Sequence, residues 1–259
     1  MGNGNIRFTR EKTNNHLAFT LDEGGNMNPY TVQKLKRAPF MMYTFLAIQT
    51  LLFAYMEIVG PFTGVGSSTS SLMLIRMGAM FPPTIIHLHQ YWRFITPIFL
   101  HIGFMHFALN SLTLYFMGRL IEDMYGHTRF AILYILSGIM GNILSFAFNT
   151  ATISAGASTS LFGLFAAFVI LRHHFPENRA IRQLSSQYMM LIGLNLVMNF
   201  FTPGIDIFGH LGGLLGGVLA GTALAIPDHS HRYKNADRLT AGGLYIFLLI
   251  GLFIWGMNR

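Results

Sequence analysis

Two short stretches of this chain hold side chains that could carry out nucleophilic chemistry. Gly156-Ala157-Ser158 places a serine in one apolar segment, and Gly209-His210 places a histidine in another, further along the chain. A serine becomes a nucleophile when a neighbouring base takes its proton, and histidine is the commonest base of this kind. Polar side chains at membrane depth are rare and mark function or packing. The pair is therefore the leading candidate for a catalytic site.

A third stretch, before both of these, carries His101, His106 and Asn110. His106 and Asn110 are four residues apart, so they share one face of a helix and could both donate hydrogen bonds to a developing oxyanion. His101 precedes His106 by five residues, about 140° around a continuous helix, and is expected to point elsewhere. This spacing argues against a metal ion bound by the two histidines.

Composition places these residues in a membrane protein. The chain is 52% hydrophobic and 10% charged, whereas a soluble domain carries roughly 25% charged residues. Runs of about 17–23 apolar residues are long enough to cross a bilayer as helices, and the sequence predicts seven of them. The expected spans are Pro39–Val59, Phe94–Met117, Phe130–Phe148, Ala155–Leu171, Ser186–Thr202, Ile205–Ile226 and Thr240–Met257.

The net charge of +7 is explained by topology rather than by nucleic-acid binding. If the N-terminus is cytoplasmic, six of the 17 Lys and Arg residues lie in the N-terminal tail and eight more in inner loops. Arg76, Arg93 and Arg259 are then the three on the outer side. Positive residues concentrate on the cytoplasmic side of membrane proteins. The sequence therefore predicts a cytoplasmic N-terminus and an extracytoplasmic C-terminus.

This topology puts Ser158 and His210 at similar depth, because the fourth and sixth helices both enter the membrane from outside. Gly209, Gly213, Gly217 and Gly221 form a stripe of small residues on the sixth helix. A comparable stripe on the fourth helix comprises Gly156, Ser160, Gly163 and Ala167. Small faces allow helices to approach closely in membranes. Close packing of these two helices would bring the serine within hydrogen-bond reach of the histidine.

Other functional classes fit less well. The absence of cysteine excludes thiolate nucleophiles and Cys-based metal sites. Haem ligation would need two histidines of matched depth and facing, and no pair among His87, His89, His101, His106 and His210 meets that condition. A transporter would need an intramembrane charge path, whereas the acidic residues fall near helix ends, and no inverted repeat is visible.

In these residues the chain resembles the rhomboid intramembrane serine proteases, from about Gln90 to Ala220. The matching residues occur in the family's order: Trp92-Arg93, His101, His106, Asn110, Glu122 in the following loop, Gly156-Ala157-Ser158 and Gly209-His210. A seventh helix after the histidine helix matches the six-plus-one layout. Thr159 departs from the pattern, because the family usually has glycine after the serine. Beside the nucleophile, a β-branched residue is expected to crowd the site and narrow the choice of substrate.

The resemblance implies an all-α polytopic membrane protein with a rhomboid-like bundle of seven transmembrane helices. It implies a dyad of Ser158 as nucleophile and His210 as general base and acid, without an acidic third member. The oxyanion would be bound by His106, Asn110 and the Ser158 backbone N–H. Phe162 would stack on the catalytic imidazole, and Gly156 would support the nucleophile. Neither cofactor nor metal is implied.

The resemblance also implies partners and a location. The substrates would be transmembrane proteins, cleaved near the outer face of the plasma membrane by a multi-pass enzyme in the lipid bilayer; an inactive rhomboid-like adaptor is the alternative. Residues 1–38 are expected to form a polar cytoplasmic tail, 39–226 the six-helix catalytic core, and 227–259 a cytoplasmic loop with the seventh helix. Gly60–Tyr91 is expected to form half-helices in the outer leaflet, and Phe201-Thr202-Pro203-Gly204 resembles a substrate gate.

Overall fold

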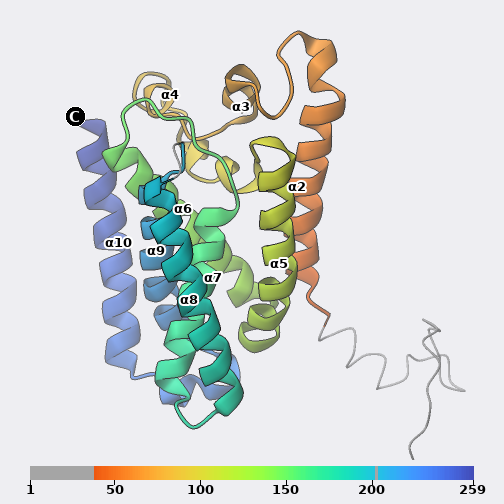
Figure 1. Ribbon diagram of the computed structural model, residues 1–259. Coiled ribbons are helices and arrows are strands. Elements are labelled where there is room, and N and C mark those ends of the chain that lie inside the picture. Colours follow the sequence, from red (N-terminus) through yellow and green to blue (C-terminus); the bar gives the residue numbers. More distant parts are fainter. Residues whose placement is uncertain (1–37, 202–203) are drawn as a thin grey trace, which may run out of the picture. The chain divides into compact units, whose positions relative to one another are not determined.

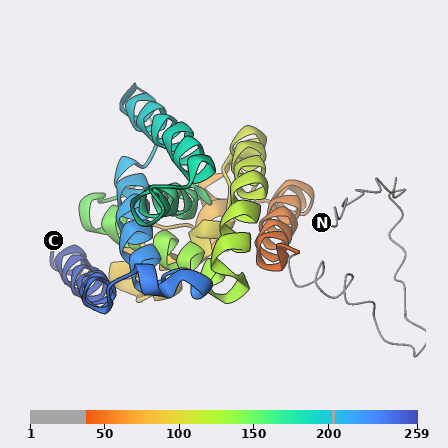
Figure 2. The ribbon, with the colours of Figure 1, turned by 90° about the horizontal axis from the view of Figure 1, so that it is seen from below.

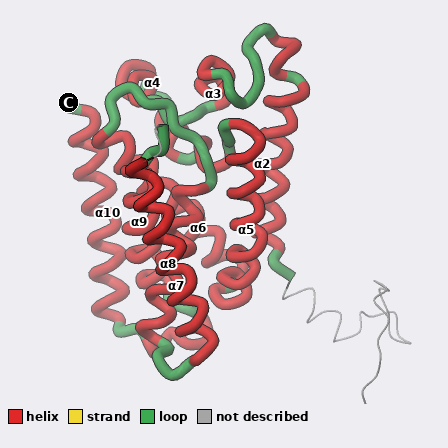
Figure 3. The backbone as a smooth tube through the Cα atoms, in the orientation of Figure 1, coloured by secondary structure: helices red, strands yellow, loops and turns green. Residues whose placement is uncertain are grey.

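The computed structural model describes residues 38–201 and 204–259, and in this part of the chain the regular structure is helical (Figures 1 and 3). The predicted tail lies outside the described residues except for Ala38, and so do two of the four residues expected to form the gate. Seven long helices run through the described part: α2 (Phe40–Ile58), α5 (Gly103–Tyr125), α6 (His127–Phe148), α7 (Ser158–His174), α8 (Arg179–Phe201), α9 (Ile207–Leu224) and α10 (Asn235–Met257).

The fold is the expected all-α membrane bundle. Within the described residues, four helices are long and apolar enough on their own to cross a membrane: α2, α6, α9 and α10. Each of the other three long helices is either too short or too polar to be recognised as a membrane span by length and composition alone. α5 carries Arg119, Glu122 and Asp123, α7 has 17 residues, and α8 begins with charged residues. Figure 1 shows the start of α2 and the end of α10 at opposite ends of the bundle.

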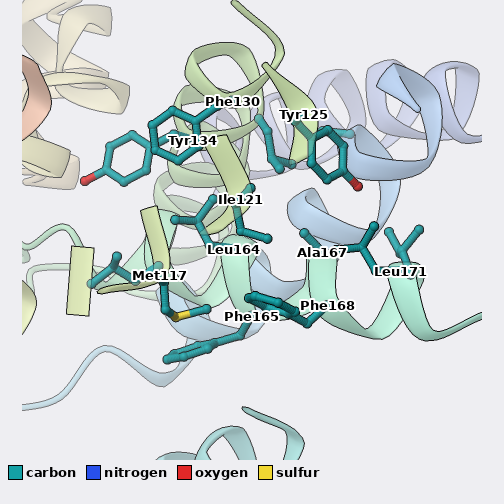
Figure 4. Close-up of a cluster of buried hydrophobic side chains, with 14 of the residues drawn as sticks. Met117, Ile121, Tyr125, Phe130, Tyr134, Leu164, Phe165, Ala167, Phe168 and Leu171 are labelled. Atoms are coloured by element: carbon teal, nitrogen blue, oxygen red, sulfur yellow. The ribbon is translucent and has the colours of Figure 1, made fainter. Parts of the chain in front are cut away.

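The helix that begins with Ser158 is also the most enclosed. α7 has buried residues along nearly its whole length, and Figure 2 shows it in the middle of the other helices. Large side chains of α5, α6 and α7 form one apolar cluster (Figure 4). This cluster includes Met117, Tyr125, Tyr134, Leu164 and Phe168. Tight packing of this kind transmits small displacements, so the start of α7 is held firmly.

α9 packs on two neighbours through two faces of small residues. Gly213 and Gly217 face the backbone of α7 so closely that a Cβ at either would overlap Thr159 or Gly163. This is the close approach that the predicted stripe required. A second pair, Gly212 and Gly216, packs in the same way on Met140 and its neighbours in α6 and was missed from sequence. Both contacts fix the position of His210, which lies on the same helix.

The segment Gly60–Tyr91 contains short helices, as expected. They are η1 (Gly60–Thr63), α3 (Ser71–Met77) and α4 (Pro82–Leu88), and Pro82 starts α4, where proline is well tolerated. α3 and α4 lie at the end of the bundle where α10 ends (Figure 1). A further short turn, η4 (Pro227–Arg232), connects α9 to α10.

The second predicted span is wrong at its start. The chain from Tyr91 to Phe99 forms two 3-10 turns, η2 (Tyr91–Phe94) and η3 (Thr96–Phe99), and Leu100 is extended. Pro97 lies within the second turn, and α5 begins only at Gly103. Proline and the left-handed Gly103 (φ 75°) account for this late start.

Glu122 also lies elsewhere than expected. The resemblance placed it in a loop, but it belongs to the last turn of α5 and its side chain is buried. Its carboxylate accepts hydrogen bonds from the Met41 and Met42 backbone N–H groups at 2.8 and 2.7 Å. The His127 Nδ1 lies 2.5 Å from the same carboxylate. Glu122 therefore caps the first turn of α2 and joins α2 to α5.

Candidate active site

Ser158 and His210 meet between α7 and α9. Ser158 is the first residue of α7, and His210 lies in the first turn of α9. The His210 Nε2 is 2.9 Å from the Ser158 Oγ, a normal hydrogen-bond distance, and both side chains are half-buried. The structure thus brings together the two residues that the sequence placed at matched depth. A base at this distance can take the hydroxyl proton.

The His210 ring is held in place by an aromatic neighbour. Phe162, one turn after Ser158 on α7, stacks on the imidazole with the ring centroids 4.3 Å apart and an interplanar angle of 18°. Phe165 in turn packs edge-on against Phe162. The stack fixes the plane of the imidazole, so its Nε2 stays directed at the serine. This is the arrangement implied by the resemblance.

His106 approaches the nucleophile from α5. A Cβ on Gly156 would lie 2.7 Å from the His106 Cε1 and 2.8 Å from its Nε2, and Gly156 itself has a φ of +148°. Glycine is therefore required here by both space and backbone conformation. The Ile102 N–H donates to the His106 Nδ1 at 3.4 Å. In the neutral ring the proton is then on Nε2, which faces the site as a donor.

His101 does not point elsewhere, and the prediction from the helical period is wrong. Its side chain is fully buried, and its ring lies 5.4 Å from that of His106 in an edge-on contact. Its Nε2 is 3.5 Å from the backbone N of Ala157, the residue before the nucleophile. The helical count did not apply because the chain is not helical at His101. His101 therefore supports both His106 and the backbone that leads into α7.

Asn110 lies one turn after His106 on α5 and is buried. One hydrogen of its Nδ2 group is donated to the His106 backbone oxygen at 2.9 Å. An amide nitrogen carries two hydrogens, so the second can serve another acceptor. Asn110 and His106 both line the cavity that also contains Ser158.

The side chain of Thr159 packs against the two helices next to α7. Its Cβ and Cγ2 fill the space that a side chain at Gly141 of α6 would need, and its Cγ2 also lies next to Gly209 of α9. The expected narrowing of substrate choice stays a prediction, because Thr159 also lines the cavity that contains Ser158. Its side chain packs between α6 and α9, where glycines on both helices leave room for it.

One cavity of about 630 Å³ is lined by Ser158, His210, Phe162, His106, Asn110 and Thr159, but not by His101. Its walls come from α5 to α9 and from the loops before α7 and α9, and they are mainly apolar, as in sites that bind apolar groups in a fixed orientation. Polar side chains not singled out from sequence also line it, namely Thr113, Asn142, Asn195 and Asp206. Asp206 carried a sequence signal that was overlooked, since Asp is a preferred residue immediately before a helix. Within residues 38–201 and 204–259, no group of three or more His, Asp or Glu side chains could hold a metal ion.

A family model decides the classification. The Rhomboid domain model matches residues 88–227, which include every residue of the site described above. The chain belongs to the rhomboid family. The match begins at the last residue of α4 and ends just after α9, so α2 and α10 of this rhomboid lie outside it.

Curated relatives agree with this classification. The rhomboid is 36% identical over 222 residues to "Rhomboid protease GluP" of Bacillus subtilis, covering 85% of this chain and 41% of the relative. It is 38% identical over 166 residues to "RHOMBOID-like protein 1" of Arabidopsis thaliana, covering 62% and 42% of the two chains. It is 34% identical over 146 residues to "Putative rhomboid protease YdcA" of Bacillus subtilis, covering 56% and 72%. The chain spans less than half the length of the first two relatives.

Proposed function

We propose that this rhomboid is an intramembrane serine endopeptidase that cleaves transmembrane segments of other membrane proteins near their outer end. The observation that carries the proposal is the 2.9 Å contact between the His210 Nε2 and the Ser158 Oγ, in a cavity that is also lined by the predicted oxyanion donors His106 and Asn110. Relatives named as proteases support the same reaction class.

In the proposed reaction, His210 takes the proton of Ser158 as its Oγ attacks the scissile carbonyl carbon. The carbonyl oxygen becomes an oxyanion, and the proton on His210 then passes to the leaving amine. Water enters next, gives a proton to His210 and attacks the acyl carbon; the Ser158 Oγ then leaves and takes the proton from His210, which restores the enzyme. Phe162 takes over the orienting function that an aspartate has in other serine proteases.

Three donors converge on the place where the oxyanion would form. Ser158 begins α7, so its backbone N–H has no partner within the helix and lies at the positive end of the helix dipole. His106 Nε2 and the second hydrogen of Asn110 Nδ2 would supply the side-chain donors. Preorganised donors of this kind contribute most of the transition-state stabilisation in acyl transfer.

The cavity supports a helical substrate that has unwound locally. Met105 and Leu109 of α5 and Asn195 of α8 line it, so it extends from the dyad towards the space between these helices. An extended segment with small residues at the cut would fit such an apolar wall. We place the enzyme in the plasma membrane with the active site near the outer face and the N-terminus in the cytoplasm.

The test compares the parent protein with Ser158→Ala, His210→Ala and the double variant in detergent. Cleavage of a transmembrane substrate and labelling of Ser158 by a fluorophosphonate are measured. Each single change should abolish cleavage while the thermal midpoint stays near that of the parent, and the double variant should be no worse, because the two residues act as one unit. Substantial cleavage by either single variant would refute the dyad. A parent that neither labels nor cleaves would instead be an inactive adaptor.

A further inference from the structure

A carboxylate lies one helical turn before the proposed base. Asp206 is the N-cap residue of α9, and the His210 N–H donates to the Asp206 backbone oxygen at 3.2 Å, so the two residues have the i, i+4 relation of a helix. Side chains with this relation are neighbours on one helix face. Both line the active-site cavity, and among its described lining residues Asp206 is the only acidic one.

The Asp206 carboxylate is held by donors from two helices. The Gly209 N–H of α9 and the Asn149 Nδ2 at the end of α6 donate to its Oδ1 at 2.9 and 3.0 Å. The Ser145 hydroxyl of α6 donates to its Oδ2. These three donors hold both oxygens of the carboxylate at the start of α9. Asp206 is thus a carboxylate with a fixed position.

An N-cap alone does not require this arrangement. A capping side chain needs one acceptor for one backbone N–H, and serine, threonine or asparagine supplies it as well as aspartate. The contacts from Ser145 and Asn149 exceed that need, and together with the Gly209 N–H they engage both carboxylate oxygens. The carboxylate is therefore built into the junction of α6 and α9 beside the active site.

The other charged or titratable groups around His210 come from neighbouring elements. His106 lies across the cavity on α5, with His101 behind it. Arg259, after α10, donates to the Phe146 and Asn149 backbone oxygens at the end of α6. The described lining residues of α7 and α8 add polar but no ionisable side chains.

We propose that Asp206 is a positioning residue whose fixed negative charge stabilises the imidazolium that His210 becomes when it takes the proton of Ser158. The inference rests on the proposed function. The step conserves charge: the proton leaves the Ser158 Oγ, His210 gains a positive charge, and the carbonyl oxygen gains a negative one. Asp206 transfers no proton and touches no reacting atom. It acts through space, in a site where little water screens the two charges.

Asp206→Asn tests this directly, because asparagine keeps the shape of the side chain and the cap but removes the charge. We expect kcat/KM to fall about 10- to 100-fold, as expected for loss of one close charge interaction in a partly buried site. The acidic limb of the pH profile of kcat/KM should move to lower pH, because a nearby anion favours protonated histidine. The thermal midpoint should change little.

A matched control removes a different anchored carboxylate. Glu57, at the outer end of α2, accepts hydrogen bonds from Ser68 and is neither on α9 nor among the cavity-lining residues. Glu57→Gln should leave the pH profile unchanged. If Asp206→Asn keeps both the parent turnover and the parent pH profile, Asp206 is a cap and nothing more, and the proposal is overturned.

A second measurement does not depend on proteolysis. The protonation of His210 can be followed by NMR in detergent with labelled histidine, and its signal can be assigned by its loss in His210→Gln. The pH at the midpoint of the His210 titration should be lower in Asp206→Asn than in the parent, even if no substrate is cleaved. Equal midpoints would refute the proposal, whereas lack of cleavage by the parent would refute only the proposed function.

Discussion

At the scale of single residues, Gly156 sets the distance between His106 and the nucleophile. In Gly156→Ala the new methyl group would lie 2.7–2.8 Å from the His106 ring, and the backbone would retain a conformation that L-residues avoid. We expect a large loss of turnover, because His106 must move away from the oxyanion position. The loss of turnover can be measured by steady-state cleavage of a transmembrane substrate.

The matched control for this prediction is Gly64→Ala. Gly64 also has a positive φ, of 71°, but a Cβ there would meet nothing within 4 Å. Gly64→Ala has the same kind of backbone strain but displaces no residue of the site, so its turnover should stay near that of the parent. Equal activity losses in the two variants would show that strain alone, and not the His106 contact, explains the effect.

Asn110→Ala separates transition-state stabilisation from packing. Loss of one oxyanion donor lowers kcat by about 10²–10³-fold in a soluble serine protease. A polar contact between membrane helices contributes only about 0.6 kcal/mol of stability on average. The variant should therefore lose turnover with little change in KM or thermal midpoint. If it unfolds and the folded remainder cleaves normally, Asn110 is structural.

His101→Ala should behave differently from Asn110→Ala. His101 is buried against the His106 ring and near the Ala157 N–H. Its removal would leave a cavity and would remove a contact that holds the His106 ring and one that holds the Ala157 backbone. We expect both turnover and thermal midpoint to fall. A variant that loses stability alone would show that His101 fills space without positioning the site.

The residue scale also shows what sequence could predict. Serine and histidine at matched depth, with Phe162 one turn below, could be located from position and resemblance, and the structure brings the three together. The direction of the Thr159 side chain could not be predicted, because it depends on how α7 is rotated against α6 and α9. His101 was misplaced because its angle was counted along a helix that had not yet begun.

At the scale of elements, the glycines of α9 allow the approach of α7. A methyl group at Gly213 or Gly217 would overlap backbone atoms of Thr159 or Gly163, which cannot rotate away. Gly213→Ala and Gly217→Ala should therefore lower the thermal midpoint and turnover together, because α9 carries His210. Thermal unfolding in detergent and cleavage rates measure the two effects.

A glycine with open surroundings provides the control for this pair. Gly251 lies in α10, and a Cβ there would meet nothing within 4 Å. Alanine is a better helix former than glycine by about 1 kcal/mol, so Gly251→Ala should keep or raise stability. If Gly251→Ala lowered the thermal midpoint and turnover as much as the two α9 variants do, the bundle would be sensitive to any glycine substitution, and the close approach of α7 and α9 would not explain the results.

The helices were easier to predict than their boundaries. Apolar length located each of the seven, but α5 and α7 begin later than expected and α8 begins earlier. Hydropathy detects only the apolar part of a helix. The first turn of α8 contains charged residues, and the last turn of α5 contains the buried Glu122, so hydropathy misplaces these ends. Capping contacts made by residues distant in sequence decide such ends, as Glu122 does for α2.

At the scale of the whole bundle, α10 is tied to the site although the family match ends before it. Gly256 packs on Phe146 of α6, and Arg259 donates to backbone oxygens of Phe146 and Asn149. Asn149 in turn donates to Asp206. The end of α6 therefore links α10 to the start of α9, where His210 lies, so the seventh helix supports the junction that the proposed chemistry needs.

The orientation of the bundle in the membrane is the last prediction. Fourteen of the 17 Lys and Arg residues lie in the N-terminal tail or in the helix ends and connections that the sequence predicts to face the cytoplasm. The chain has no cysteine, so single cysteines can report on each side without background. Ala151, in the loop between α6 and α7, and Ser230, in η4, are both exposed. In intact cells, a membrane-impermeant maleimide should label Ala151→Cys, and Ser230→Cys should be labelled only after permeabilisation. The reverse pattern would place the dyad near the cytoplasmic face and overturn the proposed site of cleavage.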